Sequence, residues 1–306
     1  MKDYISKSKN TKKNTMKNVI KNNLSAWILL VPSLFLFIVI SWKPIVTGAF
    51  LSFFEMKGFE PQGFVGLANY IEVISDSEFF TALWNTVQYV LWSIVIGFWP
   101  PILFAIMLNE MVHAKSFLKF SLYLPSMIPS IAVAMIWYFL FQPGSNGMLN
   151  ILLSKIGFAE SQWLQNSALT IPLIVFTMTW KNFGATTIMY LASLQMVNTE
   201  LYEAATIDGA GVFAKVKNIT LPQISGTVLL FFVNQMIGIF QLMTEPMVMT
   251  DGGPGNASIT LNLQSYYYAF RYLQPGKSLA MGVITFVLLI FVTVFYFKLQ
   301  KRVNEN

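Results

Sequence analysis

Six long apolar segments constrain this chain more than any other feature of its sequence. They run from about 25 to 50, 84 to 109, 120 to 141, 169 to 194, 226 to 249 and 278 to 298. A helix needs roughly 20 mostly apolar residues to cross the hydrocarbon core of a bilayer. The 306 residues are 55% hydrophobic and 11% charged, which is more apolar surface than a soluble core of this size would bury. We therefore predict an all-α polytopic membrane protein with six transmembrane helices.

The distribution of basic residues predicts the orientation of these helices. Loops rich in Lys and Arg stay in the cytoplasm, and an even number of spans places both termini on one side. Setting aside Lys43 and Lys181, which lie near or within spans, fourteen basic residues fall on the side of the termini and four on the other. The four are Lys57, Lys155, Arg271 and Lys277. Both termini are therefore predicted to be cytoplasmic, with a basic tail over residues 1–24 and one transmembrane domain over 25–306.

The charge and the polar residues exclude several classes of function. Seven lysines in the first 24 residues account for the net charge of +6, so we expect a basic tail that faces the membrane and no nucleic-acid partner. The chain has no cysteine, and its one histidine, His113, has no cysteine, second histidine or paired carboxylates near it in the sequence, so no metal or catalytic site is expected. Residues 274–278 imitate a phosphate-binding loop, but Arg271 stands where its first glycine belongs. No ATP hydrolysis is expected from this chain.

Prolines lie inside or at the edges of the first three predicted spans. They are Pro32, Pro44, Pro100, Pro101, Pro125 and Pro129. Each removes a backbone donor and is expected to bend its helix. Proline is also commoner in membrane helices than in soluble ones, so a functional bend and ordinary usage both stay open.

The loop between the fourth and fifth spans, residues 195–225, carries the strongest motif. Asn198 is a good N-cap for a helix whose first turn holds Glu200. Small residues keep this helix thin, and Gly209 and Gly211 permit a sharp turn at its end. Small side chains also let another protein approach closely. We therefore predict a short docking helix outside the membrane.

This loop resembles the E-A-A loop of binding-protein-dependent ABC permeases. The match consists of Glu203-Ala204-Ala205, three residues, Gly209, nine residues, Ile219, one residue and Leu221-Pro222. The resemblance implies a coupling helix that sits in a cleft on a cytoplasmic ATPase. The residues it assigns to that role are Glu203, Ala204, Ala205, Asp208, Gly209, Leu221 and Pro222.

Similarity to carbohydrate permeases extends over nearly the whole chain apart from the tail. It includes the stretches 66–70, 76–86 and 123–130, and residues 250–258 resemble an outer loop of the first permease in a sugar-importer pair. The resemblance implies the type I ABC importer permease fold in a bacterial plasma membrane. It also implies four kinds of partner: a second permease, two copies of an ATPase that bind ATP and Mg²⁺, an external solute-binding protein, and a sugar or oligosaccharide.

Polar residues within spans are costly and are therefore functional candidates. In the fifth span, Asn234 and Gln241 are seven residues apart on one predicted helical face, and Glu245 continues that stripe. Amides and a carboxylate suit sugar hydroxyls, but contacts between helices are an equal alternative. The further candidates for the substrate path are Gln235, Trp180 and Lys181, and Lys181 either lines the path or pairs with Glu245.

Two other functions compete with an ABC permease on the residues alone. An ion-coupled secondary transporter of small polar solutes would need titratable groups near the bilayer midplane, where only Glu245 and Lys181 are available. A membrane enzyme acting on lipid or glycan would need clustered carboxylates or histidines, and the sequence does not cluster them.

Overall fold

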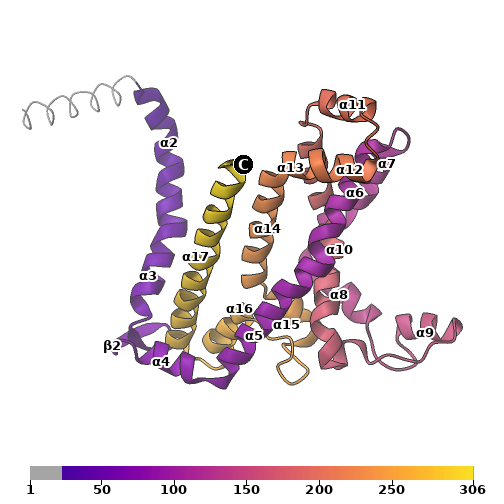
Figure 1. Cartoon of the computed structure of the whole chain (residues 1–306). Coiled ribbons are helices and arrows are strands. Elements are labelled where there is room, and N and C mark those ends of the chain that lie inside the picture. The colour runs from indigo at the N-terminus through magenta and orange to yellow at the C-terminus, as the bar shows by residue number, and fades with distance from the viewer. Residues whose placement is uncertain (1–22, 306) are drawn as a thin grey trace, which may run out of the picture.

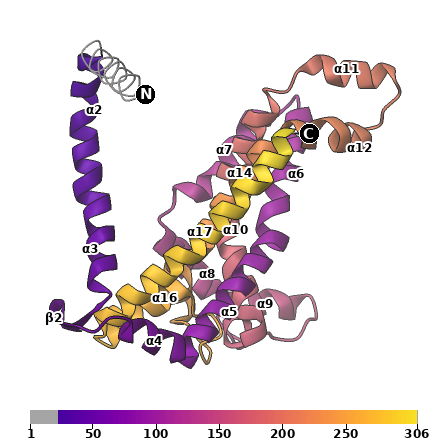
Figure 2. The same ribbon diagram turned by 60° about the vertical axis from the view of Figure 1, so that its left-hand side comes forward.

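A computed structural model describes residues 23–305, and it is helical over most of that length (Figure 1). The basic tail predicted over residues 1–24 lies almost wholly outside this part of the chain. Helix α2 (Leu24–Phe37), a π-helical segment η1 (Ile38–Trp42) and α3 (Lys43–Leu51) form one long rod. This rod stands beside the other helices in both views, and it covers the predicted first span (Figure 2).

The first outer loop departs from the all-α prediction. Strands β1 (Phe54–Lys57) and β2 (Glu60–Phe64) pair antiparallel, and Gly58 takes a positive φ of 59° in the turn between them. Helix α4 (Ala68–Ser75) follows. The Asn69 side chain donates to the carbonyls of Ser52 and Phe54, so it ties this small hairpin to the end of α3.

The second predicted span is one helical unit made of α5 (Ser77–Trp92), the π segment η2 (Ser93–Phe98) and α6 (Trp99–Glu110). The side chain of Asp76 caps it by accepting the N–H of Glu78 at 3.0 Å. Its π segment precedes Pro100 and Pro101, and η1 similarly ends just before Pro44. Prolines lack the N–H that the preceding turn needs, so the expected local disturbance occurs at both places.

The third predicted span is not a straight helix. Helices α7 (Lys115–Tyr123) and α8 (Ser130–Leu140) are joined through the 3₁₀ turn η3 (Leu124–Met127) and bend by 94°. Pro125 and Pro129 flank the bend, which explains its position. The segment between α8 and the fourth predicted span contains the helix α9 (Met148–Lys155) and the 3₁₀ turn η4 (Trp163–Gln165).

The fourth predicted span is the single helix α10 (Ser167–Leu194), capped by Asn166, whose side chain accepts the N–H of Ala168. After it come α11 (Thr199–Ile207), α12 (Val212–Lys215), η5 (Val216–Thr220) and α13 (Leu221–Gln223). Helix α14 (Ser225–Phe240) then turns away by 70°. The predicted fifth span, 226–249, is therefore broken, because α14 ends at Phe240 and α15 (Thr244–Thr250) begins anew.

The last part of the chain begins at the end of the molecule opposite α11 (Figure 1). Helix α16 (Leu261–Tyr266), the π segment η6 (Tyr267–Arg271) and α17 (Pro275–Glu305) follow a glycine-rich loop. Asn85 of α5 donates to the carbonyls of Asn256 and Ile259, and the Tyr89 hydroxyl donates to that of Ser258. Thus the second predicted span holds this loop in place.

Three buried apolar clusters succeed one another along the bundle. One joins α5, α16 and α17, a second joins α5, α8, α10 and α15, and a third joins α6, α10 and α14. The clusters place α10 at the centre, in contact with α5, α6, α7 and α8. The start of α2, the end of α17 and helix α11 lie at one end of the molecule, whereas β2, α4, α9 and α16 lie at the other (Figure 1).

Three described helices are long and apolar enough to cross a membrane, over Trp27–Leu51, Ser77–Glu110 and Pro275–Lys298. Counting each of the two bent pairs as one span would raise that number to five. Helix α10 is not among them, but its 28 residues would extend about 42 Å at the α-helical rise. That length exceeds the roughly 30 Å hydrocarbon core.

Gly184 sets the approach of α7 to α10. A Cβ atom at this position would lie 1.9 Å from the carbonyl oxygen of Leu122. That neighbour is backbone and cannot rotate away, so only glycine fits.

We predict that Gly184→Ala destabilises the folded protein by about 1–3 kcal/mol or more, because α7 must move to relieve the clash. The matched control is Gly226→Ala in α14, where an added Cβ meets no atom within 4 Å. The melting temperature of each purified variant would test this. It would be measured as the temperature at which heating removes the monodisperse peak on size-exclusion chromatography. Equal melting temperatures for the two variants would contradict it.

Candidate functional site

The predicted docking helix is present as α11. Its N-cap Asn198 accepts the N–H of Glu200 at 3.0 Å and donates to the carboxylate of the same residue at 3.1 Å. Its C-terminus passes through Asp208 into Gly209, which takes a φ of +76°. Both ends are therefore set by local chemistry that the residue types predicted.

Much of the surface of this loop is solvent-exposed and partly apolar. Glu203, Ala204 and Asp208 are exposed, while Ala205 is half-buried. The side chains of Ile207 and Phe213 are 87% and 80% exposed. An apolar and acidic surface of this kind, displayed on a thin helix, suits contact with another protein more than contact with water.

Two side-chain contacts tie α11 to the segment that leads into α14. The hydroxyls of Tyr202 and Thr220 lie 3.0 Å apart, and the Lys215 ammonium donates to the Thr206 hydroxyl at 2.8 Å. The predicted loop residues Leu221 and Pro222 form α13 immediately before the 70° bend. The loop is thus attached firmly to the helix that follows.

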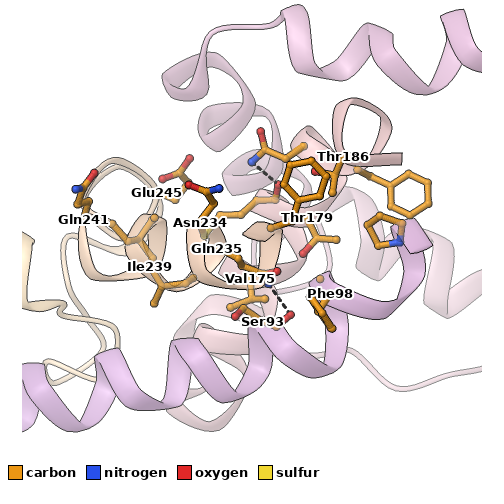
Figure 3. Close-up of a pocket in the computed structure, with 18 of the residues that line it drawn as sticks. Ser93, Phe98, Val175, Thr179, Thr186, Asn234, Gln235, Ile239, Gln241 and Glu245 are labelled. Carbon is orange, nitrogen blue, oxygen red and sulfur yellow. Dashed lines mark hydrogen bonds between the residues drawn. The ribbon is translucent and has the colours of Figure 1, made fainter. Parts of the chain in front are cut away.

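A second feature is a cavity of about 640 Å³ in the middle of the bundle (Figure 3). Its walls come from η2, α6, α8, α10, α14 and α15. The polar residues that line it include four predicted for the substrate path, Asn234, Gln235, Gln241 and Glu245. The structure therefore brings these four side chains to one cavity.

The route by which they meet differs from the prediction of one continuous helical stripe. Because α14 ends at Phe240, Gln241 is its C-cap and Glu245 lies in the first turn of α15. Asn234 and Gln241 are exposed to the cavity, whereas Gln235 is half-buried and donates to the carbonyl of Ser93 at 2.8 Å. Gln235 consequently joins α14 to η2, which is the alternative role proposed for such residues.

Trp180 and Lys181 do not line this cavity. Trp180 packs edge-to-face on Trp137 and borders a smaller apolar cavity of about 350 Å³. The Lys181 ammonium donates to the Ser130 hydroxyl at 2.8 Å, and Ser130 lines the large cavity. Among the described residues, the ion pairs are Arg271 with Asp251 and Lys277 with Glu72, so Lys181 makes no direct ion pair with Glu245 here.

Several cavity residues were not identified from the sequence. They are Ser130, Thr179, Asn182, Thr186 and Thr244. Asn182 is a polar residue within the fourth predicted span and could have been found by the rule applied to the fifth span. The threonines carry no such signal, because their hydroxyls commonly bond to carbonyls of their own helix.

Residues 101–305, two thirds of the chain, match the family of binding-protein-dependent transport system inner membrane components. The chain belongs to this family. The predicted resemblance to ABC importer permeases is thereby confirmed, and the matched region contains both the α11 loop and nearly all of the cavity wall.

Three related proteins cover most of this permease. AraP of Bacillus subtilis, an arabinooligosaccharide transport permease, is 31% identical over 90% of this chain and 88% of its own length. UgpA of Escherichia coli, an sn-glycerol-3-phosphate transport permease, is 32% identical over 79% of this chain and 81% of its own length. A solved chain of a bacterial alginate ABC transporter, in complex with an alginate pentasaccharide-bound periplasmic protein, has a TM-score of 0.82. It is 25% identical and covers 94% of this permease and 97% of that chain.

The different positions of Asn234 and Gln235 predict different defects in two neighbouring variants. Asn234→Leu should lower uptake by the assembled importer while leaving its melting temperature unchanged, because Asn234 donates only within its own helix, to Leu230. Gln235→Leu should destabilise the permease by about 1–3 kcal/mol, since the Ser93 carbonyl loses a donor. Uptake per assembled complex and melting temperature would be measured for both. An Asn234→Leu permease that fails to assemble would contradict the assignment.

Proposed function

We propose that this permease is one of two membrane-spanning subunits of an ATP-driven importer for a sugar or oligosaccharide. The observation that carries the proposal is the cavity lined by amide, hydroxyl and carboxylate side chains, since these groups suit sugar hydroxyls. The names of relatives such as the arabinooligosaccharide permease AraP agree with it. Family membership favours this function over an ion-coupled secondary transporter.

The proposed topology has six spans in a bacterial plasma membrane and both termini in the cytoplasm. The spans are the α2–α3 rod, the α5–α6 unit, the bent pair α7 and α8, then α10, α14 and α17. The basic-residue count supports this orientation. It is also supported by the position of the α11 loop at the same end as the start of α2 and the end of α17 (Figure 1).

In this proposal α11 is the coupling helix. Glu203 and the exposed Ile207 would face a cleft on the cytoplasmic ATPase. Two ATPase copies would bind ATP and Mg²⁺, and this chain would hold no cofactor. Nucleotide-driven closure of the ATPases would draw the coupling helices of the two permeases together.

Transport would then follow by alternating access. A second permease would supply the rest of the wall around the path. Movement of the paired helices would turn the path outward to accept the oligosaccharide from a solute-binding protein, and hydrolysis would return it. No bond in the sugar is made or broken by this chain.

The topology can be tested with reporter fusions. A fluorescent protein fused after Asn306 should be fluorescent. Alkaline phosphatase fused at the same place should be inactive, because the phosphatase matures only outside the cytoplasm. As a control, phosphatase inserted after Gly157, in the exposed loop beyond α9, should be active. Active phosphatase at Asn306 would refute the proposed orientation.

The coupling role can be tested with a matched pair of glycines. Gly209→Val should abolish ATP-driven uptake, because a β-branched residue is strongly disfavoured at a φ of +76°. Gly211→Val should be tolerated, since Gly211 has a φ of −70° and ψ of 168°, with no atom within 4 Å of an added Cβ.

Membrane levels, co-purification of the ATPase and ATP hydrolysis would be measured for both glycine variants. We expect near-normal membrane levels in each, with loss of ATPase binding or of stimulated hydrolysis in Gly209→Val alone. Normal stimulated hydrolysis and uptake in Gly209→Val would remove the coupling assignment.

A further inference from the structure

The amide groups of the cavity have a fixed polarity. Asn182 donates its Nδ2 to the carbonyl of Met178 at 3.1 Å, and Asn234 does the same to Leu230 at 3.1 Å. Gln235 donates its Nε2 to the carbonyl of Ser93. A backbone carbonyl can only accept a hydrogen bond, so the amide nitrogen must face it in each case. In these three of the four lining amides the oxygen therefore points away from that carbonyl, and the nitrogen keeps one further N–H.

The charge of the cavity wall has the same sign as the partial charge on these amide oxygens. Of the described residues that line the cavity, Glu245 alone carries an ionisable acidic or basic side chain other than a tyrosine. Lys181 acts on this carboxylate electrostatically, but it lies outside the lining and its ammonium is hydrogen-bonded to Ser130. The wall therefore offers its ligand neutral amide and hydroxyl groups together with one carboxylate, and the described residues that line it include no Lys, Arg or His.

We infer that this cavity selects uncharged, hydroxyl-rich saccharides and rejects anionic ones such as uronates and sugar phosphates. Sugar hydroxyls can donate to the amide oxygens of Asn182, Asn234 and Gln235, whereas a carboxylate or phosphate has no proton to donate and meets the charge of Glu245. The inference rests on the proposed function. Relatives do not decide it, because their names include a neutral oligosaccharide, a phosphate ester and an acidic polysaccharide.

The absence of cysteine from the sequence makes this charge measurable without knowledge of the substrate. Gln241→Cys would place the chain's single thiol at the cavity, within a complete importer reconstituted with cysteine-free partners. The rates of modification by a cationic and an anionic methanethiosulfonate reagent would be compared, each divided by its rate with a free thiol. We expect the cationic reagent to be favoured by about tenfold, as one nearby carboxylate attracts one reagent and repels the other.

Adding Glu245→Gln to the Gln241→Cys permease should bring the ratio of the normalised cationic rate to the normalised anionic rate close to one. The matched control is Glu160→Gln, which removes the same charge from an exposed residue that does not line the cavity. It should leave the ratio unchanged. A ratio near one before the change, or a ratio that Glu245→Gln does not move, would overturn the inference.

A competition experiment separates this inference from the proposed function. In the reconstituted importer with its solute-binding protein, a neutral arabinotriose or maltotriose should slow the modification of Gln241→Cys, and trigalacturonate should not. Protection by trigalacturonate alone would overturn the charge selection while leaving an oligosaccharide importer intact. A thiol that all reagents modify, with no protection by any saccharide and no saccharide uptake, would instead count against the proposed function.

Discussion

The structure depends on one constraint, which is that a backbone polar group in lipid must find its partner inside the protein. Prolines and π segments alter the regular helical bonds, so contacts from neighbouring helices matter where they occur. Gln235 donates to the carbonyl of Ser93, the first residue of η2. An added Cβ at Gly97 would lie 3.1 Å from the Gln235 amide nitrogen and 3.0 Å from the Thr179 hydroxyl. This π segment is therefore where α5–α6, α10 and α14 meet at the cavity.

Backbone groups buried inside the protein need partners for the same reason, and the loop after α15 is an example, since Ser258, Ile259 and Thr260 are buried. Asn85 and Tyr89 donate to carbonyls of this loop, and the Ser258 hydroxyl donates to that of Gly253. The Asp251 carboxylate pairs with Arg271 and accepts the hydroxyl of Tyr267. Burial and the nearby carboxylate raise the pKa of Tyr267, so the phenol keeps the proton that it donates. The outer end of the cavity is thus built on a fixed support.

Sequence reasoning located the elements whose signals are local. The helical cap at Asn198 and the turn at Gly209 depend only on neighbouring residues, and both occur as predicted. The break at Gln241–Met243 is marked by Pro246 in the first turn of α15, because proline lacks the N–H that would bond to the carbonyl of Leu242 in a continuous helix. It is stabilised by contacts from afar, since Thr260 donates to the carbonyl of Leu242 and Asn262 to that of Gln241. The spacing of polar residues alone predicted a straight stripe through Glu245 and did not take Pro246 into account. That geometry was wrong, although Asn234, Gln235, Gln241 and Glu245 do line one cavity.

Trp180 was misplaced for a related reason. An aromatic residue beside a lysine in a span could face either a path or a neighbouring helix, and only the position of Trp137 on α8 decides between them. The 94° bend that sets α8 against α10 had visible prolines, but its angle did not follow from them. The prolines predicted where the helices would bend. Tertiary packing then determined the bend angle and which side chains came into contact.

The connection between the two sites follows from the course of the chain. Thr220 is hydrogen-bonded to Tyr202 of α11, and α13 leads from it through a 70° bend into α14. Asn234 lies nine residues beyond Ser225, which is about 13.5 Å along an α-helix. Between α11 and the cavity the chain therefore runs through α12, η5, α13 and the 70° bend into α14. Because Gln235 of α14 donates to the Ser93 carbonyl of η2, a displacement of α14 would strain or break its contact with this neighbouring wall of the cavity.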